Sequence, residues 1–175
     1  MALTPDTKDW TWVLERTCPE CGFDPANYPS SIFASTLLGR ANEWTVILAR
    51  DDVRARTRED RWSDLEYACH VRDVYRVMDG RLVLMMEQDN PIFQNWDQDD
   101  TAINERYDLQ DPPVVGSELM AAADDFATRV ESVGPDDWAR PGTRSNGSRF
   151  SVETLIRYSV HDVFHHLWDV TRSDS

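Results

Sequence analysis

Apolar residues recur every three or four positions in four separate stretches of the chain, which is the period of an α-helix with one buried face. The pattern predicts helices over about 30–52, 63–88, 113–133 and 151–172. Four such helices predict an all-α fold, a four-helix bundle. The inward positions are Phe33, Leu37, Ala41, Trp44 and Leu48, then Val71, Val74, Met78, Leu82 and Met85, then Leu119, Ala122, Phe126, Val130 and Val133, and finally Val152, Ile156, Val160, Val163, Leu167 and Val170.

The segments between these stretches carry residues that start helices or form turns. A Ser-Asp-Leu-Glu capping box begins the second helix at Ser63. Residues 90–112 form a long connection, a length that is typical of functional loops. The dipeptide Asn146-Gly147 predicts a small hairpin before the last helix.

The chain has 175 residues, which suits one bundle domain preceded by a short segment. Prolines and a glycine interrupt any helix in the N-terminal part, so we expect an irregular segment over 1–29 and a bundle with long connections over 30–175. No window approaches the roughly 18 apolar residues of a membrane span, and no signal peptide is visible. Three cysteines are too few for a secreted disulfide framework, and we expect a cytoplasmic protein.

The charge is strongly acidic, with 18 basic and 32 acidic residues and a formal net charge of −14. Such a chain repels phosphate backbones and anionic membranes unless its positive charges are clustered. The arginines between residues 50 and 61 alternate with acidic residues and form no basic stripe. We therefore expect no nucleic-acid or membrane partner, and a small-molecule substrate instead.

Three of the four histidines lie on the predicted last helix. His161 and His165 are four residues apart, so they share one helix face and can bind one metal ion. His166 shares a different face with Asp162 and Asp169, and this arrangement fits a surface histidine in a row of ion pairs.

The fourth histidine, His70, lies on the second helix, one turn from Glu66 and Asp73. Carboxylates and an imidazole on one face of an apolar bundle are costly to bury unless something pairs with them. His70 with His161 and His165 would supply three imidazoles, a set that suits Zn, Ni, Cu or Fe and leaves an open position for water or substrate. A hydrogen-bonded core histidine is the alternative for His70 alone.

The N-terminal segment contains Cys-Pro-Glu-Cys-Gly at 18–22, which has the shape of a zinc or rubredoxin knuckle. Such sites need a second pair of ligands, and the remaining cysteine, Cys69, is expected in the core. Three interpretations stay open for Cys18 and Cys21. They are reduced thiols in a tight turn, a redox pair or local disulfide, or ligands of a second metal, shared across a dimer in one version.

The segments 62–73 and 161–166 together resemble the DinB/YfiT-like metalloproteins, whose pattern places Trp-Ser/Thr and His-x-x-Asp at the second helix and His-x-x-x-His on the last. The resemblance implies a divalent metal on His70, His161 and His165, a bundle with long connections and often a homodimer. The family includes mycothiol-dependent maleylpyruvate isomerases, bacillithiol S-transferases and a domain of sulfoxide synthases.

We expect an enzyme in which Zn or Ni activates a low-molecular-weight thiol such as mycothiol, for S-transfer or isomerisation, or a water molecule. Glu66 would act as a base, and Asp73 would orient His70. Tyr158 and Arg149 would hold an anionic substrate or the thiol. Two alternatives remain: a non-catalytic, stress-related bundle with a structural ion, and a metal-free interaction protein with an acidic partner surface.

Overall fold

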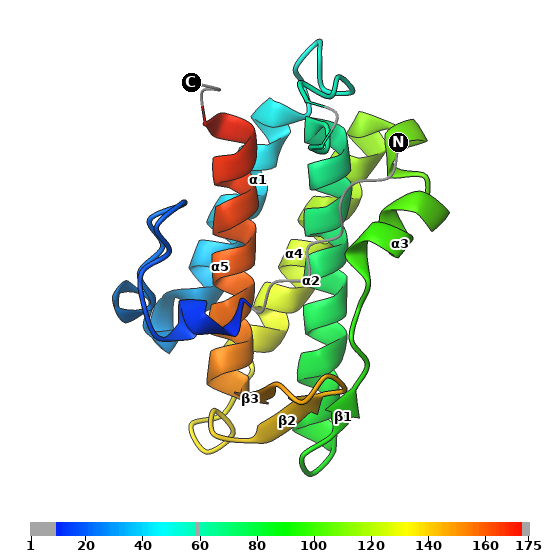
Figure 1. Ribbon diagram of the computed structural model, residues 1–175. Coiled ribbons are helices and arrows are strands. Elements are labelled where there is room, and N and C mark those ends of the chain that lie inside the picture. Colours follow the sequence, from blue (N-terminus) through cyan, green and yellow to red (C-terminus); the bar gives the residue numbers. More distant parts are fainter. Residues whose placement is uncertain (1–9, 59, 173–175) are drawn as a thin grey trace.

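The computed structural model describes residues 10–58 and 60–172, and its centre is a bundle of four long helices (Figure 1). α4 and α5 each pack against both α1 and α2, so the order around the bundle is α1, α4, α2, α5. This arrangement confirms the predicted all-α four-helix bundle. The helices are α1 (Phe33–Ile47), α2 (Asp64–Glu87), α4 (Pro112–Glu131) and α5 (Val152–Thr171).

The two helices that carry histidines both begin with a capping box. At α2 the Ser63 hydroxyl accepts the Glu66 N–H at 3.3 Å, and the Glu66 carboxylate accepts the Ser63 N–H at 2.9 Å. At α5 Ser151 and Thr154 cap each other in the same way. These caps satisfy N–H groups that have no partner inside the helix, and they fix where each helix starts.

The first helix is shorter than the predicted 30–52. A 3₁₀ turn, η3 (Ser30–Ile32), precedes α1, and after Ile47 the chain continues in turns closed by bonds such as Arg50 N–H to the Ile47 carbonyl at 3.1 Å. The reason lies in the contact that follows, because Val53 is buried and its carbonyl accepts the Leu65 N–H at 2.9 Å. The start of α2 thus holds the chain in a position that a continued helix could not reach.

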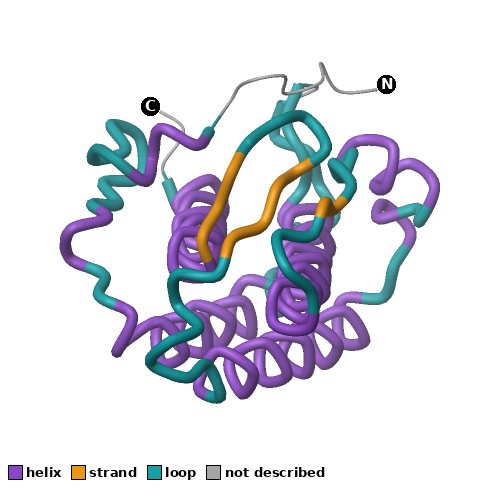
Figure 2. The backbone as a smooth tube through the Cα atoms, turned by 90° about the horizontal axis from the view of Figure 1, so that it is seen from below, coloured by secondary structure: helices purple, strands orange, loops and turns teal. Residues whose placement is uncertain are grey.

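The long connection after α2 contains β1 (Ile92–Phe93), the short helix α3 (Gln98–Asn104) and η4 (Tyr107–Leu109). β1 pairs in parallel with β2 (Pro141–Arg144), and β2 pairs antiparallel with β3 (Arg149–Ser151). The β2–β3 pair is the predicted hairpin, and Gly147 in its turn has a φ of 94°. Figure 2 shows this sheet lying across one end of the bundle.

The N-terminal segment packs along α5, on the left of that helix in Figure 1. It contains two 3₁₀ turns, η1 (Thr11–Leu14) and η2 (Pro25–Asn27), and η1 contacts α5 directly. Val13, Cys18 and Phe23 are buried there and belong to the main hydrophobic core. Within the described residues, no helix is long and apolar enough to cross a membrane.

Candidate metal centre

α5 carries two overlapping pairs of polar side chains, each with a spacing of four residues. His161 and His165 form one pair, and Asp162 and His166 form the other. A shift of one residue turns a side chain by about 100° around the helix axis. The first pair therefore meets the N-terminal segment, whereas the second pair meets His70 on α2. The structure divides the three predicted histidine ligands between these two groups.

The group between α2 and α5 consists of His70, Asp162 and His166. One potential ligand atom from each residue lies within 4.8 Å of the others. His70 Nε2 is 3.7 Å from Asp162 Oδ1, and His166 Nε2 is 3.3 Å from the same oxygen. His70 is fully buried, and neither of its ring nitrogens has a hydrogen-bond partner among the described residues. The core-histidine alternative required such a hydrogen bond.

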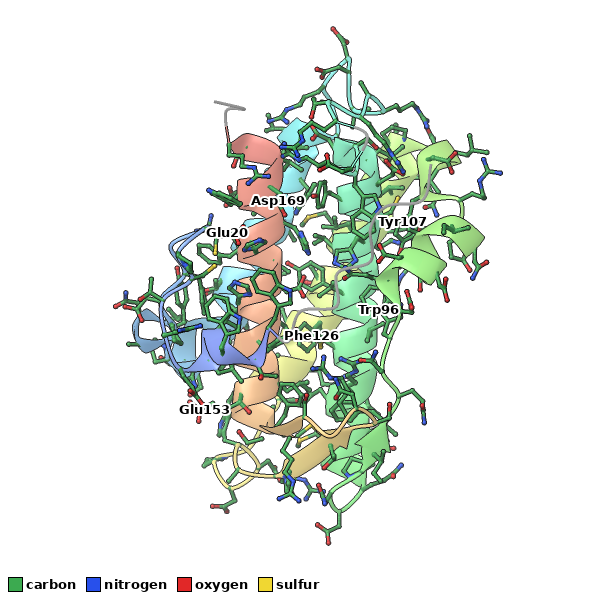
Figure 3. The ribbon with its side chains drawn as sticks, in the orientation of Figure 1. Glu20, Trp96, Tyr107, Phe126, Glu153 and Asp169 are labelled. Atoms are coloured by element: carbon green, nitrogen blue, oxygen red, sulfur yellow. The ribbon has the colours of Figure 1, made fainter. Side chains whose placement is uncertain are left out.

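Aromatic side chains surround the His70 ring. The Trp96 ring stacks on it, with centroids 5.3 Å apart and planes 3° apart, and the Trp62 centroid is 5.1 Å away. Trp96 comes from the long connection and donates its indole N–H to the Thr101 hydroxyl at 2.8 Å. Figure 3 shows Trp96 beside α2. The long connection thus supplies one wall of the group.

Electrostatics separate the three side chains. Burial lowers the pKa of His70, so its imidazole is neutral near pH 7. Burial alone would raise the pKa of Asp162, but His166 and His70 outweigh that effect and hold it well below its usual range. For His166, burial would lower the pKa, but Asp162 and Asp169 raise it to about 10. The two carboxylates therefore create a site that attracts positive charge.

Glu66, the predicted base, is buried and fully engaged in local contacts. Its Oε2 accepts the Ser63 hydroxyl at 2.8 Å and Arg56 Nε at 2.9 Å, and its Oε1 forms an ion pair with the same guanidinium. Burial raises its pKa, but Arg56 and Ser63 together bring it below the ordinary value. The structure thus places Glu66 in the α2 cap, where Ser63 and Arg56 hold its carboxylate.

Asp73, predicted to orient His70, faces a different network. Its carboxylate accepts Arg72 Nε at 2.9 Å and Arg76 Nη1 at 3.2 Å, and the Tyr107 hydroxyl also donates to it. Because His70 has no hydrogen-bond partner among the described residues, Asp73 does not bond to it. Asp73 joins α2 to η4 and the long connection.

Tyr158 lies one turn before Asp162 on α5 and is largely buried. Two arginines act on it: the Arg144 guanidinium is 6.0 Å from its ring centroid, and burial raises the pKa of Tyr158 to about 12 although the charges of Arg144 and buried Arg81 lower it. Burial, and secondly the charge of Arg144, lowers the pKa of Arg81 to about 10. Arg149, the other predicted substrate contact, is exposed on β3 in the sheet at the end of the bundle.

The second group joins His161 and His165 to Cys18 and Cys21. One potential ligand atom from each of the four lies within 4.8 Å of the others, and Cys18 Sγ is 3.7 Å from His165 Nδ1. Burial lowers the pKa of His161 to about 4 and also lowers that of His165, so both rings are neutral at pH 7. Cys18 and Cys21 are free thiols.

The predicted ion pairs of His166 with Asp162 and Asp169 are present, but the row is not on the surface: His166 is largely buried, and Asp162 and His166 lie beside His70. The sequence His-Asp-Val-Phe-His-His contains two equally spaced pairs, and spacing alone cannot say which pair faces which neighbour. The feature of the sequence that could have distinguished the two pairs is a second carboxylate, Asp169. Asp169 lies 3.1 Å from His166 Nδ1, as a side chain does when it orients a metal-binding imidazole.

Comparison with known proteins gives one family and one fold. A family model described as the DinB superfamily matches residues 36–170. The structure is similar to that of YfiT from Bacillus subtilis, described as "a probable metal-dependent hydrolase with an unusual four-helix bundle topology". The TM-score is 0.73 with 13% sequence identity, over 90% of this chain and 93% of YfiT, a likeness that shows a shared fold. A search of curated proteins finds no match.

Proposed function

This chain belongs to the DinB superfamily, and we propose that it is a metal-dependent enzyme whose ion is bound by His70, Asp162 and His166. The observation that carries the proposal is a set of buried polar atoms that make no hydrogen bond. Both ring nitrogens of His70 and Oδ1 of Asp162 are buried without a hydrogen bond, in a place where His166 also converges. Burying such atoms unpaired is costly, and a cation offsets that cost.

The donor set fits a catalytic divalent ion. Two imidazole nitrogens and one carboxylate oxygen are the protein ligands of several zinc hydrolases and of non-haem iron sites, and they leave a position open. Because the pKa of His166 is raised to about 10, a dication would displace its proton on binding, and one carboxylate with two neutral imidazoles would then leave a net charge of +1. The site therefore favours an anionic fourth ligand. Zn and Ni are the metals we expect, and the description of YfiT supports a hydrolytic reaction.

A bound dication would supply Lewis acidity, which polarises a substrate and acidifies water. Residues of the chain would orient the ligands, exclude water and attract the substrate. Asp169 holds His166 through Nδ1 and directs Nε2 toward Asp162. Trp96 covers one face of the His70 ring and keeps water from it. The positive charges of Arg81 and Arg144, next to Tyr158, favour a small anionic substrate.

Hydrolysis of simple chromogenic substrates tests the proposal. The zinc-loaded chain is assayed on 4-nitrophenyl acetate and 4-nitrophenyl phosphate, with and without a chelator, beside Asp162→Asn. We expect a zinc-dependent rate that the Asn variant lowers to the chelator level. Cys69→Ser is the matched control, since the Cys69 thiol faces the Tyr107 carbonyl and the Gln110 side chain and belongs to neither group. Equal rates with and without metal would contradict the hydrolytic assignment.

A low-molecular-weight thiol is the second candidate ligand, because a thiolate would neutralise the net charge of +1. Its test is the absorption spectrum of the cobalt-loaded chain before and after addition of mycothiol or bacillithiol. A new sulfur-to-cobalt band that Asp162→Asn abolishes would support S-transfer, and an unchanged spectrum would leave water as the ligand. Sedimentation velocity tests the homodimer that we propose from the family resemblance.

A further inference from the structure

The four side chains on the other face of α5 have the composition of a closed zinc site. Cys18 and Cys21 follow a Cys-x₂-Cys spacing, and His161 and His165 follow a His-x₃-His spacing. These are the spacings of zinc sites built from two cysteines and two histidines. We propose that Cys18, Cys21, His161 and His165 bind a structural Zn²⁺ ion, separate from the ion proposed at His70.

The distances suit one tetrahedral ion. Zinc bonds of about 2.0–2.3 Å place neighbouring ligand atoms roughly 3.5 Å apart. Cys18 Sγ and His165 Nδ1 are 3.7 Å apart, and all four ligand atoms lie within 4.8 Å of one another. Small side-chain rotations are enough to close the set around an ion.

Burial gives an independent reason to expect a ligand here. His161 is 4% exposed, and its Nε2 has no hydrogen-bond partner among the described residues. Cys18 is 0% exposed, and its Sγ lies 3.7 Å from His165 Nδ1. A buried ring nitrogen without a partner costs free energy, which a metal bond would recover.

The backbone around the cysteines already has the shape of a metal-binding turn. The Gly22 N–H donates to the Cys18 carbonyl at 3.0 Å, and the Cys18 N–H donates to the Phe23 carbonyl at 2.8 Å. Gly22 has a φ of 73°, a left-handed conformation that glycine adopts without strain. The turn presents both thiols to α5 before any ion arrives.

Charge and neighbouring groups distinguish this site from the one at His70. Two thiolates and two neutral imidazoles cancel the charge of a dication, so the filled site is neutral and needs no further ligand. Glu20, labelled in Figure 3 beside α5, lies 3.7 Å from His165 Nε2 and can orient that ring while Nδ1 binds metal. Four protein ligands leave no open position, which is the arrangement of a structural ion.

The proposed ion would connect parts of the chain that are far apart in the sequence. The ion would tie the N-terminal segment to α5, across 139 intervening residues between Cys21 and His161. The Trp10 ring packs on both imidazoles, with centroids 5.8 and 5.0 Å away, and shields them. We therefore expect removal of the ion to destabilise residues 10–29 more than the four-helix bundle.

Cobalt substitution tests the site with a readout independent of activity. The full chain is purified under reducing conditions, loaded with Co²⁺, and compared with Cys18→Ser and with Cys69→Ser as the matched cysteine control. We expect the intense sulfur-to-cobalt absorption of a tetrahedral thiolate site in the wild type and in Cys69→Ser. In Cys18→Ser that absorption falls to half or less, and the bound metal drops by one ion per chain.

Native mass spectrometry of the zinc-loaded chain makes the result independent of variant folding. The wild type is expected to carry two zinc ions, and Asp162→Asn is expected to lose one while keeping the cobalt–thiolate band. A wild type without a thiolate band, or a Cys18–Cys21 disulfide that persists in reductant, would overturn the proposal. A wild type that carries the thiolate-bound ion but no second ion that Asp162→Asn removes would instead contradict the proposed function.

Discussion

Replacing Glu66 with Gln tests the structural role of this residue at the start of α2. The Glu66 side chain is 5% exposed and accepts hydrogen bonds from Ser63 N–H, the Ser63 hydroxyl and Arg56. Gln keeps the shape and still accepts from Ser63, so the cap survives, but the buried negative charge is lost. A hydrogen bond to a charged group contributes about 1.5–3 kcal/mol, against about 0.5–1.5 kcal/mol for a neutral one.

Arg56 is 31% exposed and can be rehydrated, which discounts the loss. We therefore expect Glu66→Gln to lower the free energy of unfolding by about 1–2 kcal/mol at pH 7. At roughly 2–4 °C per kcal/mol for a chain of this size, the Tm falls by about 2–8 °C. Differential scanning calorimetry measures it. The exposed pair of Arg40 and Glu43 supplies the control, since Glu43→Gln should change stability by less than about 0.5 kcal/mol.

The pH dependence of the stability difference between wild type and Glu66→Gln gives a second test. The pKa of Glu66 is lower in the folded chain than the ordinary value of 4.5, so its charge stabilises the fold above that pH. The stability is lost as the pH falls below 4.5 and through the folded pKa. The difference between wild type and Glu66→Gln should therefore shrink in acid. Equal Tm values at pH 7, or a difference that does not change with pH, would refute the assignment.

Two further substitutions test packing and ligand orientation. In Gly142→Ala, the new Cβ would lie 2.8 Å from Met85 and 2.9 Å from Phe93, so we expect a loss of about 1–3 kcal/mol in urea unfolding; unchanged stability would contradict the close packing of the sheet end. Asp169→Asn removes the carboxylate beside His166, so we expect about 10–100-fold weaker zinc binding in competition titrations; unchanged affinity would place the ion elsewhere.

The helices could be predicted because their seams follow a local period. Leu37 and Trp44 in α1 and Val160 and Val163 in α5 are buried as the spacing requires. The capping box at Ser63 could also be predicted, because Ser63 and Glu66 are only three positions apart in the sequence. Local spacing did not predict the end of α1, which depends on the contact of Val53 with Leu65 at the start of the next helix.

The candidate site could be predicted only in part, for the same reason. The histidines on α2 and α5 identified the helices concerned. Which of these histidines lie together depends on which face of α5 meets α2 and which face meets the N-terminal segment. That choice is made by tertiary packing of Val13, Phe23 and their neighbours, and no pattern within α5 reveals it. Cys18 and Cys21 lacked partners in the sequence because those partners lie well over a hundred residues away.

Counting the zinc ions bound per chain tests most directly the proposal that α5 presents two metal sites on two faces. Native mass spectrometry of the reduced, zinc-loaded chain should find two ions in the wild type. It should find one in Cys18→Ser and one in Asp162→Asn. The contradicting result would be a single ion in the wild type, retained in Cys18→Ser and lost in His161→Ala. One site would then join His161 to His70, and the proposal of two sites would be wrong.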